Sequence, residues 1–413
     1  MPLPDILVLS VFLIVYYVMA VGKLPGLSAD RTGIAMAGAF MLIALGAVGV
    51  NELPEIIEFP TLLMLFVLML LAAHFAAANS FNVLSQWLSY RADRPKLLLA
   101  GVVISGGGLS MVLVNDIVVF AFTPVLCMAL MRQGLDPRPY LLALAGAANA
   151  GSAVSLIGNP QNILIGSVGA LSIHDYFLLT IVPVLLALGV VYAVVNRVWC
   201  NQLQQATTIR YWEDDHTADR WLFIKSLLAT MILIVLLILF SQFRYQIALG
   251  VVLFLLLGRV IKTDRLLKEV DLPLLVLIAS LFVVTAAFSA LPMTGSAVSY
   301  LETQGWLPDR LAVLIPFSLI ASNTIGNVPA VMLLLGVTEN LSVITLQGLA
   351  LFSTLAGNLL LTGSLANIIV AERASSQGVK LGFMDFMRVG IPITVLSMVP
   401  AALWFSWATG MPW

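Results

Sequence analysis

Four polar segments interrupt the apolar stretches of this sequence, and their residue types are suited to binding small polar solutes. The segments are residues 105–116, 149–162, 321–329 and 353–367. Asparagine recurs in them, as Asn115, Asn162, Asn327 and Asn367. Amides and hydroxyls donate and accept hydrogen bonds without charge, so these groups could hold a hard cation or a hydroxylated solute. Single glycines and serines are more typical of helix packing, but four asparagines together favour a binding site.

Asp116 is the residue with the strongest chemical implication. It lies between the apolar runs MVLV and IVVF, where a carboxylate costs about 2.5–3.5 kcal/mol on membrane-insertion scales. Carboxylates at membrane depth usually face a cavity or a proton path. Alternatively, Asp116 could cap the helix expected over 117–131 by accepting backbone N–H bonds. We favour a role for Asp116 in binding a proton or another ion.

The composition places these residues in a membrane protein. The chain is 61% hydrophobic and 10% charged, whereas a soluble domain carries about 25% charged residues. A net charge of −1 without a long basic run argues against nucleic acid as a partner. Two cysteines and three histidines without metal-ligand spacing predict neither a disulfide framework nor a metal or other cofactor. No catalytic constellation occurs at membrane depth, so we do not expect an enzyme.

Ten segments are apolar enough to cross the hydrocarbon core, which takes about 20 helical residues. They are 5–22, 32–50, 59–79, 139–170, 176–197, 221–241, 245–260, 272–291, 342–371 and 386–410. Of these, 139–170 and 342–371 contain polar segments and are read as broken helices. Two further segments, 96–131 and 308–338, are polar near their middles and predict re-entrant hairpins. Such bare backbone is tolerated at membrane depth only where protein or water covers it.

The basic residues orient these segments, because cytoplasmic loops collect Lys and Arg. With both termini outside, every Lys and Arg except Arg244 and Arg310 falls in a loop predicted to be cytoplasmic. Lys96 and Arg132 flank the first hairpin on the same side, as a re-entrant segment requires. A single crossing there would place one of them, and every later loop, on the wrong side.

The two halves of the chain predict an inverted repeat, because five crossings per half reverse the orientation of the second. We expect repeat 1 over 1–197, a cytoplasmic linker over 198–220 and repeat 2 over 221–413. Five pairs match in order: Ser110 with Ser322, Asn115 with Asn327, Gly158 with Gly363, Asn159 with Ser364, and Asn162 with Asn367. The fold class is therefore an all-α polytopic membrane protein with five transmembrane helices and one re-entrant hairpin per repeat and broken helices at the midplane. Interrupted segments in matching positions point to a transporter binding site.

Four stretches of the sequence resemble a known family. VNDIVVFAFTP, LIGNPQNILIG, SNTIGNVPAVMLL and GNLLLTGSLANIIVAERA are similar to the arsenite permease and sodium–proton antiporter (ArsB/NhaD-type) branch of the ion transporter superfamily. The resemblance implies a prokaryotic plasma membrane location, alternating access and a scaffold that often dimerises. It implies hairpin-tip ligands at Asn115, Asp116, Ser322, Asn323, Thr324 and Asn327. It implies broken-helix ligands at Gly158, Asn159, Asn162, Gly363, Ser364 and Asn367.

Three transported solutes are consistent with these residues. The first is arsenite or antimonite, a small neutral trihydroxide exported in exchange for protons. The second is sodium in exchange for protons, although Asp116 is the one clear midplane carboxylate. The third is another small anion, which the lack of Lys and Arg in the four polar segments disfavours. Related dicarboxylate carriers have Ser-Asn-Thr at both hairpin tips, whereas the first tip here reads Val114-Asn115-Asp116. This difference argues against a dicarboxylate substrate and against a symmetric pair of sodium sites. The expected partners are the solute, a proton or sodium ion and the lipid bilayer, and a homodimer or an ATPase subunit stays open.

Overall fold

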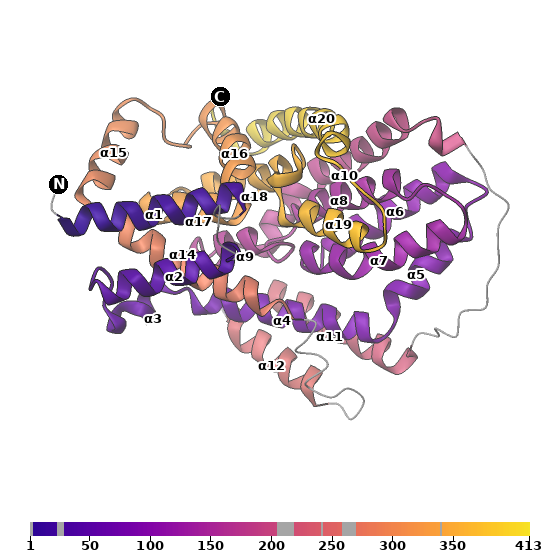
Figure 1. Cartoon of the computed structure of the whole chain (residues 1–413), viewed down its shortest axis with the longest axis horizontal. Coiled ribbons are helices and arrows are strands. Elements are labelled where there is room, and N and C mark those ends of the chain that lie inside the picture. The colour runs from indigo at the N-terminus through magenta and orange to yellow at the C-terminus, as the bar shows by residue number, and fades with distance from the viewer. Residues whose placement is uncertain (1–2, 23–28, 205–218, 241–242, 258–269, 339–340) are drawn as a thin grey trace.

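A computed structural model describes residues 3–22, 29–204, 219–240, 243–257, 270–338 and 341–413 (Figure 1). All regular secondary structure within these ranges is helical. Seven of the described helices are long and apolar enough to cross a membrane. They are α1 (Leu3–Val21), α4 (Phe59–Ala77), α7 (Asn115–Arg132), α10 (Ile173–Val198), α11 (Arg220–Leu239), α14 (Leu272–Ser289) and α20 (Phe383–Thr409). The predicted all-α polytopic fold class is confirmed.

The remaining helices complete an order that recurs in the two halves. In the first half these are α2 (Arg31–Ala44), α3 (Leu53–Ile56), α5 (Ser80–Ser89), α6 (Pro95–Ser110), α8 (Arg138–Ser152) and α9 (Pro160–Val168). In the second half they are α12 (Arg244–Leu256), α15 (Pro292–Thr303), α16 (Leu311–Ile325), α17 (Asn327–Val337), α18 (Val343–Ala356) and α19 (Leu365–Ser376). Apart from the short α3, each helix of the first half has a counterpart at the same place in the second. The opposite membrane orientation of the halves stays a prediction, and most of the expected linker, 205–218, lies outside the described residues.

Both predicted hairpins are pairs of helices that meet at a short turn and contact each other. Helices α6 and α7 are joined by residues 111–114, and α16 and α17 meet at Gly326. Gly326 has φ +94° and ψ 157°, a conformation that essentially only glycine adopts. The second hairpin therefore turns on a single residue, whereas the first needs four.

The predicted broken helices end and restart because their sequences carry local capping signals. Helix α9 begins after Asn159, whose side chain accepts a hydrogen bond from the Asn162 backbone N–H (2.9 Å), and Pro160 occupies its first turn. Helix α19 begins after Ser364, whose hydroxyl accepts from the Ala366 N–H (3.2 Å). Asn and Ser are preferred N-caps, and proline suits the first helical position. The breaks therefore leave backbone groups and polar side chains in the interior.

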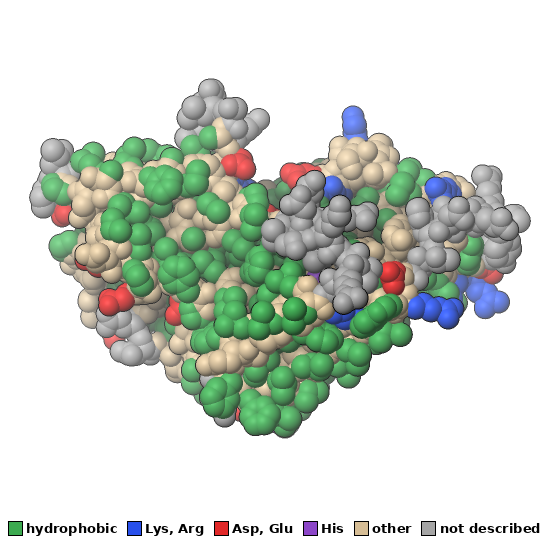
Figure 2. Space-filling model, turned by 90° about the horizontal axis from the view of Figure 1, so that it is seen from below, with side chains coloured by type: hydrophobic (Ala, Val, Ile, Leu, Met, Phe, Trp, Pro, Cys, Tyr) green, Lys and Arg blue, Asp and Glu red, His purple; other side chains and the backbone are tan. Residues whose placement is uncertain are grey.

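The outer surface is largely apolar. Figure 2 shows hydrophobic side chains over most of one face, with Lys and Arg gathered toward one end. Exposed apolar side chains recur along α11 and α20, among them Met231, Leu239, Leu403 and Trp407. A continuous apolar surface of this kind marks a membrane-facing region, as the sequence predicts.

Candidate functional site

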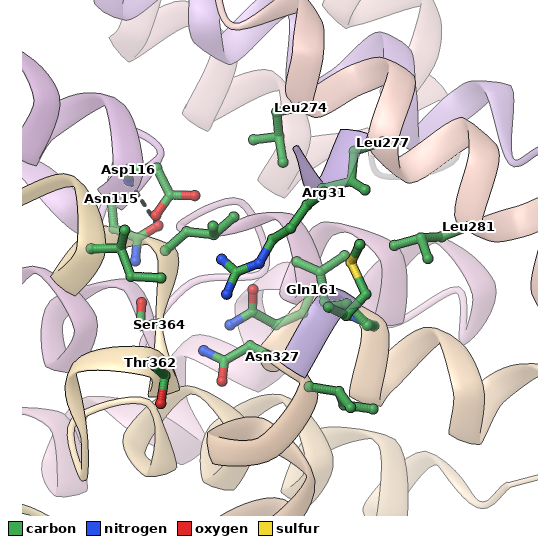
Figure 3. A pocket seen from close by; sticks show the side chains of 17 residues that line it. Arg31, Asn115, Asp116, Gln161, Leu274, Leu277, Leu281, Asn327, Thr362 and Ser364 are labelled. Carbon is green, nitrogen blue, oxygen red and sulfur yellow. Dashed lines mark hydrogen bonds between the residues drawn. The ribbon is translucent and has the colours of Figure 1, made fainter. Parts of the chain in front are cut away.

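A cavity of about 40 Å³ lies where both hairpin tips meet the broken helices. A cavity of this size holds a few water molecules, so it fits a solute of only a few heavy atoms. Apolar side chains of α1, α14, α17 and α19 form part of its wall. The polar part of the wall is Arg31, Asn115, Asp116, Gln161, Asn327, Thr362 and Ser364 (Figure 3).

The tip of the first hairpin is held by Asn115, the first residue of α7. Its backbone N–H donates to the Gly158 carbonyl (2.9 Å), and its side-chain oxygen accepts from the Asp116 N–H (2.9 Å). Its side-chain amide nitrogen donates to Asn149 (3.1 Å). Asn115, and not the carboxylate of Asp116, therefore satisfies the first backbone group of this helix.

Because the Asn115 side chain satisfies the Asp116 backbone N–H, the carboxylate of Asp116 is left to interact with the cavity. Its side chain is 6% exposed and lines the cavity. Among the described residues, no group donates a hydrogen bond to its carboxylate. Asp116 therefore does not cap α7 in this structure. A buried carboxylate is costly unless something compensates it. Asp116 thus can take up a proton or bind a solute from the cavity.

The tip of the second hairpin presents Asn327 at the equivalent place. With its amide nitrogen turned toward the Gly363 carbonyl, Asn327 donates to that oxygen (2.8 Å) and accepts from Gln161 Nε2 (3.2 Å). Gly158 and Gly363, which match in the two halves, therefore both accept a hydrogen bond from a hairpin-tip asparagine. The two tips converge on one cavity from opposite halves of the chain.

Two buried side chains that sequence reasoning missed bind the halves together. Asn149 of α8 accepts from Ser364 (2.9 Å) and donates to Asn367 (3.0 Å), and it also contacts Asn115. Thr354 of α18 accepts from Asn159 (3.1 Å). Thr354 also donates to the Asn162 side chain (3.2 Å). Each broken helix is thus held by a residue of the other half. The sequence could have identified both residues, because Asn149 and Thr354 lie at or near the start of a polar segment.

The predicted site residues divide into two groups in space. Asn115, Asp116, Asn327 and Ser364 line the cavity. Asn159, Asn162 and Asn367 are buried in the network behind it. Which of them contacts a solute stays a prediction.

The remaining predicted residues of the second hairpin lie away from the cavity wall. Asn323 donates to the Leu319 and Ala356 carbonyls (both 2.9 Å). Ser322 is buried, and Thr324 is exposed and bonds back to the Ile320 carbonyl (2.6 Å). Asn323 therefore ties the hairpin to α18.

The two predicted glycines permit close backbone approach. A Cβ at Gly158 would lie 2.8 Å from the Ser152 Cα. One at Gly363 would lie 3.0 Å from the Gly357 carbonyl oxygen and would also meet Asn323 Oδ1. The backbone leaves no room for a side chain at Gly158, and a side chain at Gly363 would displace Asn323, so both breaks favour glycine.

Arg31 is the cavity residue that the sequence analysis did not select. It was assigned to a cytoplasmic loop, and the polar segments contain no Lys or Arg, but the first residue of α2 points its guanidinium into the space between Asp116 and Gln161 (Figure 3). A cation therefore lies at the cavity although the four polar segments contain none. The physical reason is that α2, which carries no polar segment, closes one wall of the cavity.

Known proteins similar to this chain include three that cover all or part of it. A 46 kDa membrane protein of Mycobacterium leprae is 24% identical over 97% of this chain and 98% of its own length. The silicon efflux transporter LSI3 of Oryza sativa subsp. japonica is 26% identical over 95% of this chain and 96% of its own. The transporter arsB of Dictyostelium discoideum is 29% identical over 38% of this chain and 28% of its own.

The fold and the family agree with these relatives. The crystal structure of the Alcanivorax borkumensis YdaH transporter is similar, with a TM-score of 0.55 at 13% identity, over 98% of each chain. A family profile described as citrate transporter (CitMHS) matches residues 14–345. That range includes both hairpin tips and the first broken helix. The chain therefore belongs to the CitMHS citrate transporter family and is a membrane transporter.

Proposed function

We propose that this protein exports arsenite or antimonite in exchange for protons across a prokaryotic plasma membrane. The observation that carries the proposal is a small cavity lined by amides and hydroxyls around Asp116, whose carboxylate has no hydrogen bond from the described residues. The names of two relatives, a silicon efflux transporter and arsB, support efflux of a small solute of this kind.

The polarity of the cavity favours an uncharged, hydroxyl-rich solute. Asn115, Asn327 and Gln161 each supply donors and acceptors without net charge, and arsenite at neutral pH is mostly a trihydroxide. Citrate would bring three carboxylates into a cavity of about 40 Å³. Arg31 is the one cation on the described wall, against the three carboxylates of citrate. A tricarboxylate therefore fits this site poorly in size and in charge.

Exchange with a proton gives export a driving force. When a neutral solute leaves and one proton enters, one positive charge moves inward. That charge is worth about 2.3 kcal/mol per 100 mV of membrane potential. Both the potential and the proton gradient then favour efflux, and Asp116 is the group that would carry the proton.

The test of this function is transport in everted membrane vesicles. We expect arsenite uptake that depends on an imposed proton gradient and is absent from vesicles without the protein. Asp116→Asn should keep the fold and abolish the proton-driven component. Asp175→Asn, which changes an exposed carboxylate at the start of α10, is the matched control and should transport normally. Full activity of Asp116→Asn in proteoliposomes with an imposed pH gradient would contradict the coupling role.

A second candidate, transport of another small anion, is favoured by one observation. Arg31 lines the cavity, and a guanidinium is well suited to a carboxylate or other oxyanion. In the same vesicles, inorganic phosphate or citrate should then compete with arsenite or replace it. Sodium-dependent proton movement without arsenite uptake would instead support the sodium–proton antiporter.

A further inference from the structure

Arg31 has a counterpart in the second half of the chain. Arg31 begins α2 and Arg244 begins α12. The same number of residues separates Arg31 from Arg244, Glu58 from Asp271 and Pro60 from Pro273. Glu58 and Asp271 immediately precede α4 and α14. The two arginines are therefore at equivalent positions of the repeated helix order.

Arg244 lies at a second cavity of about 30 Å³, which is the counterpart of the first. Its wall includes Thr61, Met64, Ile157 and Ile163. At the matching positions of the other half, the first cavity is lined by Leu274, Leu277, Thr362 and Ile368. The molecule thus contains two related cavities, each with one arginine at the start of the second helix of a half.

The two arginines differ in their contacts. Arg244 Nη1 donates to the Gly166 carbonyl (2.7 Å) near the end of α9. Beside it, Tyr245 shares a hydrogen bond with Ser167 (3.1 Å), and Ser167 donates to Glu58 (3.2 Å). These bonds tie α12 and α4 to a broken helix, so a polar cluster borders the second cavity.

Arg31 has no such tie within the described part of the chain. Its Nε is buried and has no hydrogen-bond partner among the described residues. In the second half, Ala371 matches Gly166 and Glu372 matches Ser167. Glu372 acts on Arg31 only through its charge. A buried donor with no partner among the described residues is costly to keep away from water, so the Arg31 Nε–H is a group that a solute could bind.

The second cavity also holds a free polar group. Thr61 is 1% exposed, and its hydroxyl has no hydrogen-bond partner among the described residues. The cavity is therefore able to offer a solute at least this hydroxyl and, once its tie is broken, the guanidinium of Arg244.

We propose that Arg31 and Arg244 are paired solute-positioning residues at the two ends of the transport path, and that they exchange roles during the cycle. In the structure described, Arg31 faces the solute cavity while Arg244 is held by the Gly166 carbonyl. In the opposite state, Arg31 binds the carbonyl of Ala371 and Arg244 faces the solute. The inference rests on the proposed transport function but not on the identity of the solute.

The experiment measures arsenite transport separately from each face of proteoliposomes with known protein orientation. The predicted orientation places Arg31 toward the cytoplasm and Arg244 outside. Losing a hydrogen bond to a charged group costs about 1.5–3 kcal/mol, which is roughly tenfold or more in affinity. Arg31→Gln should therefore raise KM about tenfold or more on the cytoplasmic face only, and Arg244→Gln on the outer face only. Arg31→Lys and Arg244→Lys should recover part of this loss.

Arg310→Gln is the matched control, because Arg310 also bonds to a backbone carbonyl, that of Gly305, but lines neither cavity. It should change neither KM. Equal changes of KM on both faces, or lower stability with both KM values unchanged, would overturn the proposal.

A second readout does not depend on the solute. Thr61→Cys places a thiol in the second cavity, and Arg244→Gln should increase its labelling by a maleimide added outside, because the tie to Gly166 is lost. Absence of arsenite flux in the unmodified protein, together with increased labelling, would reject the proposed solute and support the arginine pair. Unchanged labelling would reject the pair.

Discussion

Asn149 shows how a single amide organises the site. Its oxygen accepts from Asn115 and Ser364 while its nitrogen donates to Asn358 and Asn367. The residue is 1% exposed, so no bulk water can replace these partners. Its side chain thereby joins the first hairpin tip to the second broken helix and sets the position of Ser364 at the cavity.

Replacing Asn149 should therefore cost both stability and transport. Interhelical hydrogen bonds in membrane proteins average about 0.6 kcal/mol each, so Asn149→Ala should lower the free energy of unfolding by roughly 2 kcal/mol. Thermal unfolding in detergent would measure the loss, and transport should fall with it. Thr324→Ala, at an exposed side chain that bonds only within its own helix, should change stability by less than about 0.5 kcal/mol. Equal stability of the two variants would contradict the role of Asn149.

The first hairpin and the first broken helix depend on close contact between α6 and α8. A Cβ at Gly151 would lie 2.7 Å from the Gly107 Cα, and one at Gly106 would lie 2.6 Å from the Leu144 side chain. Small residues let membrane helices approach closely. The distance between these two elements therefore determines where the tip carrying Asp116 lies relative to Gly158.

Gly151→Ala should separate these elements, because backbone rather than a flexible side chain fills the space. We expect reduced solute affinity or loss of transport, together with a lower unfolding temperature. Gly108→Ala is the control in the same hairpin, since a Cβ there would meet nothing within 4 Å. The two variants, compared in one transport assay, test the contact, and an active Gly151→Ala protein would show that the packing is not needed.

At the scale of the whole molecule, the recurring helix order and the two related cavities are what an alternating-access transporter requires. Equivalent cavities allow one site to be reached in turn from each face. The state described has a tied cavity at Arg244 and an untied one at Arg31. With the predicted orientation, the cavity with the untied arginine lies toward the cytoplasm.

Cysteine labelling tests that orientation. In a background carrying Cys127→Ser and Cys200→Ser, Lys96→Cys and Arg132→Cys should both react with an impermeant maleimide from the cytoplasm. Asp309→Cys, at an exposed position before α16, should react only from outside. The physical basis is the retention of Lys and Arg in cytoplasmic loops. Reaction of positions 96 and 132 from opposite faces would refute the re-entrant hairpin.

Much of the architecture is predictable from the sequence because its causes are local. Gly326 marks the turn of the second hairpin, and Asn159 and Ser364 cap the helices that restart after each break. Composition predicts the membrane environment, and matched asparagines predict the repeat. Local capping and backbone freedom depend on neighbours in the chain, so a sequence is enough to recognise them.

Only the tertiary structure shows which residues line the cavity. Of the predicted residues, Asn115, Asp116, Asn327 and Ser364 reach the wall, while Asn162 and others turn into the network behind it. Arg31 joins them from a helix far away in the sequence. By itself, the sequence determined which residues could bind a solute and where the helices break. The tertiary structure decided which of them face it, because that depends on the rotation and packing of helices from both halves.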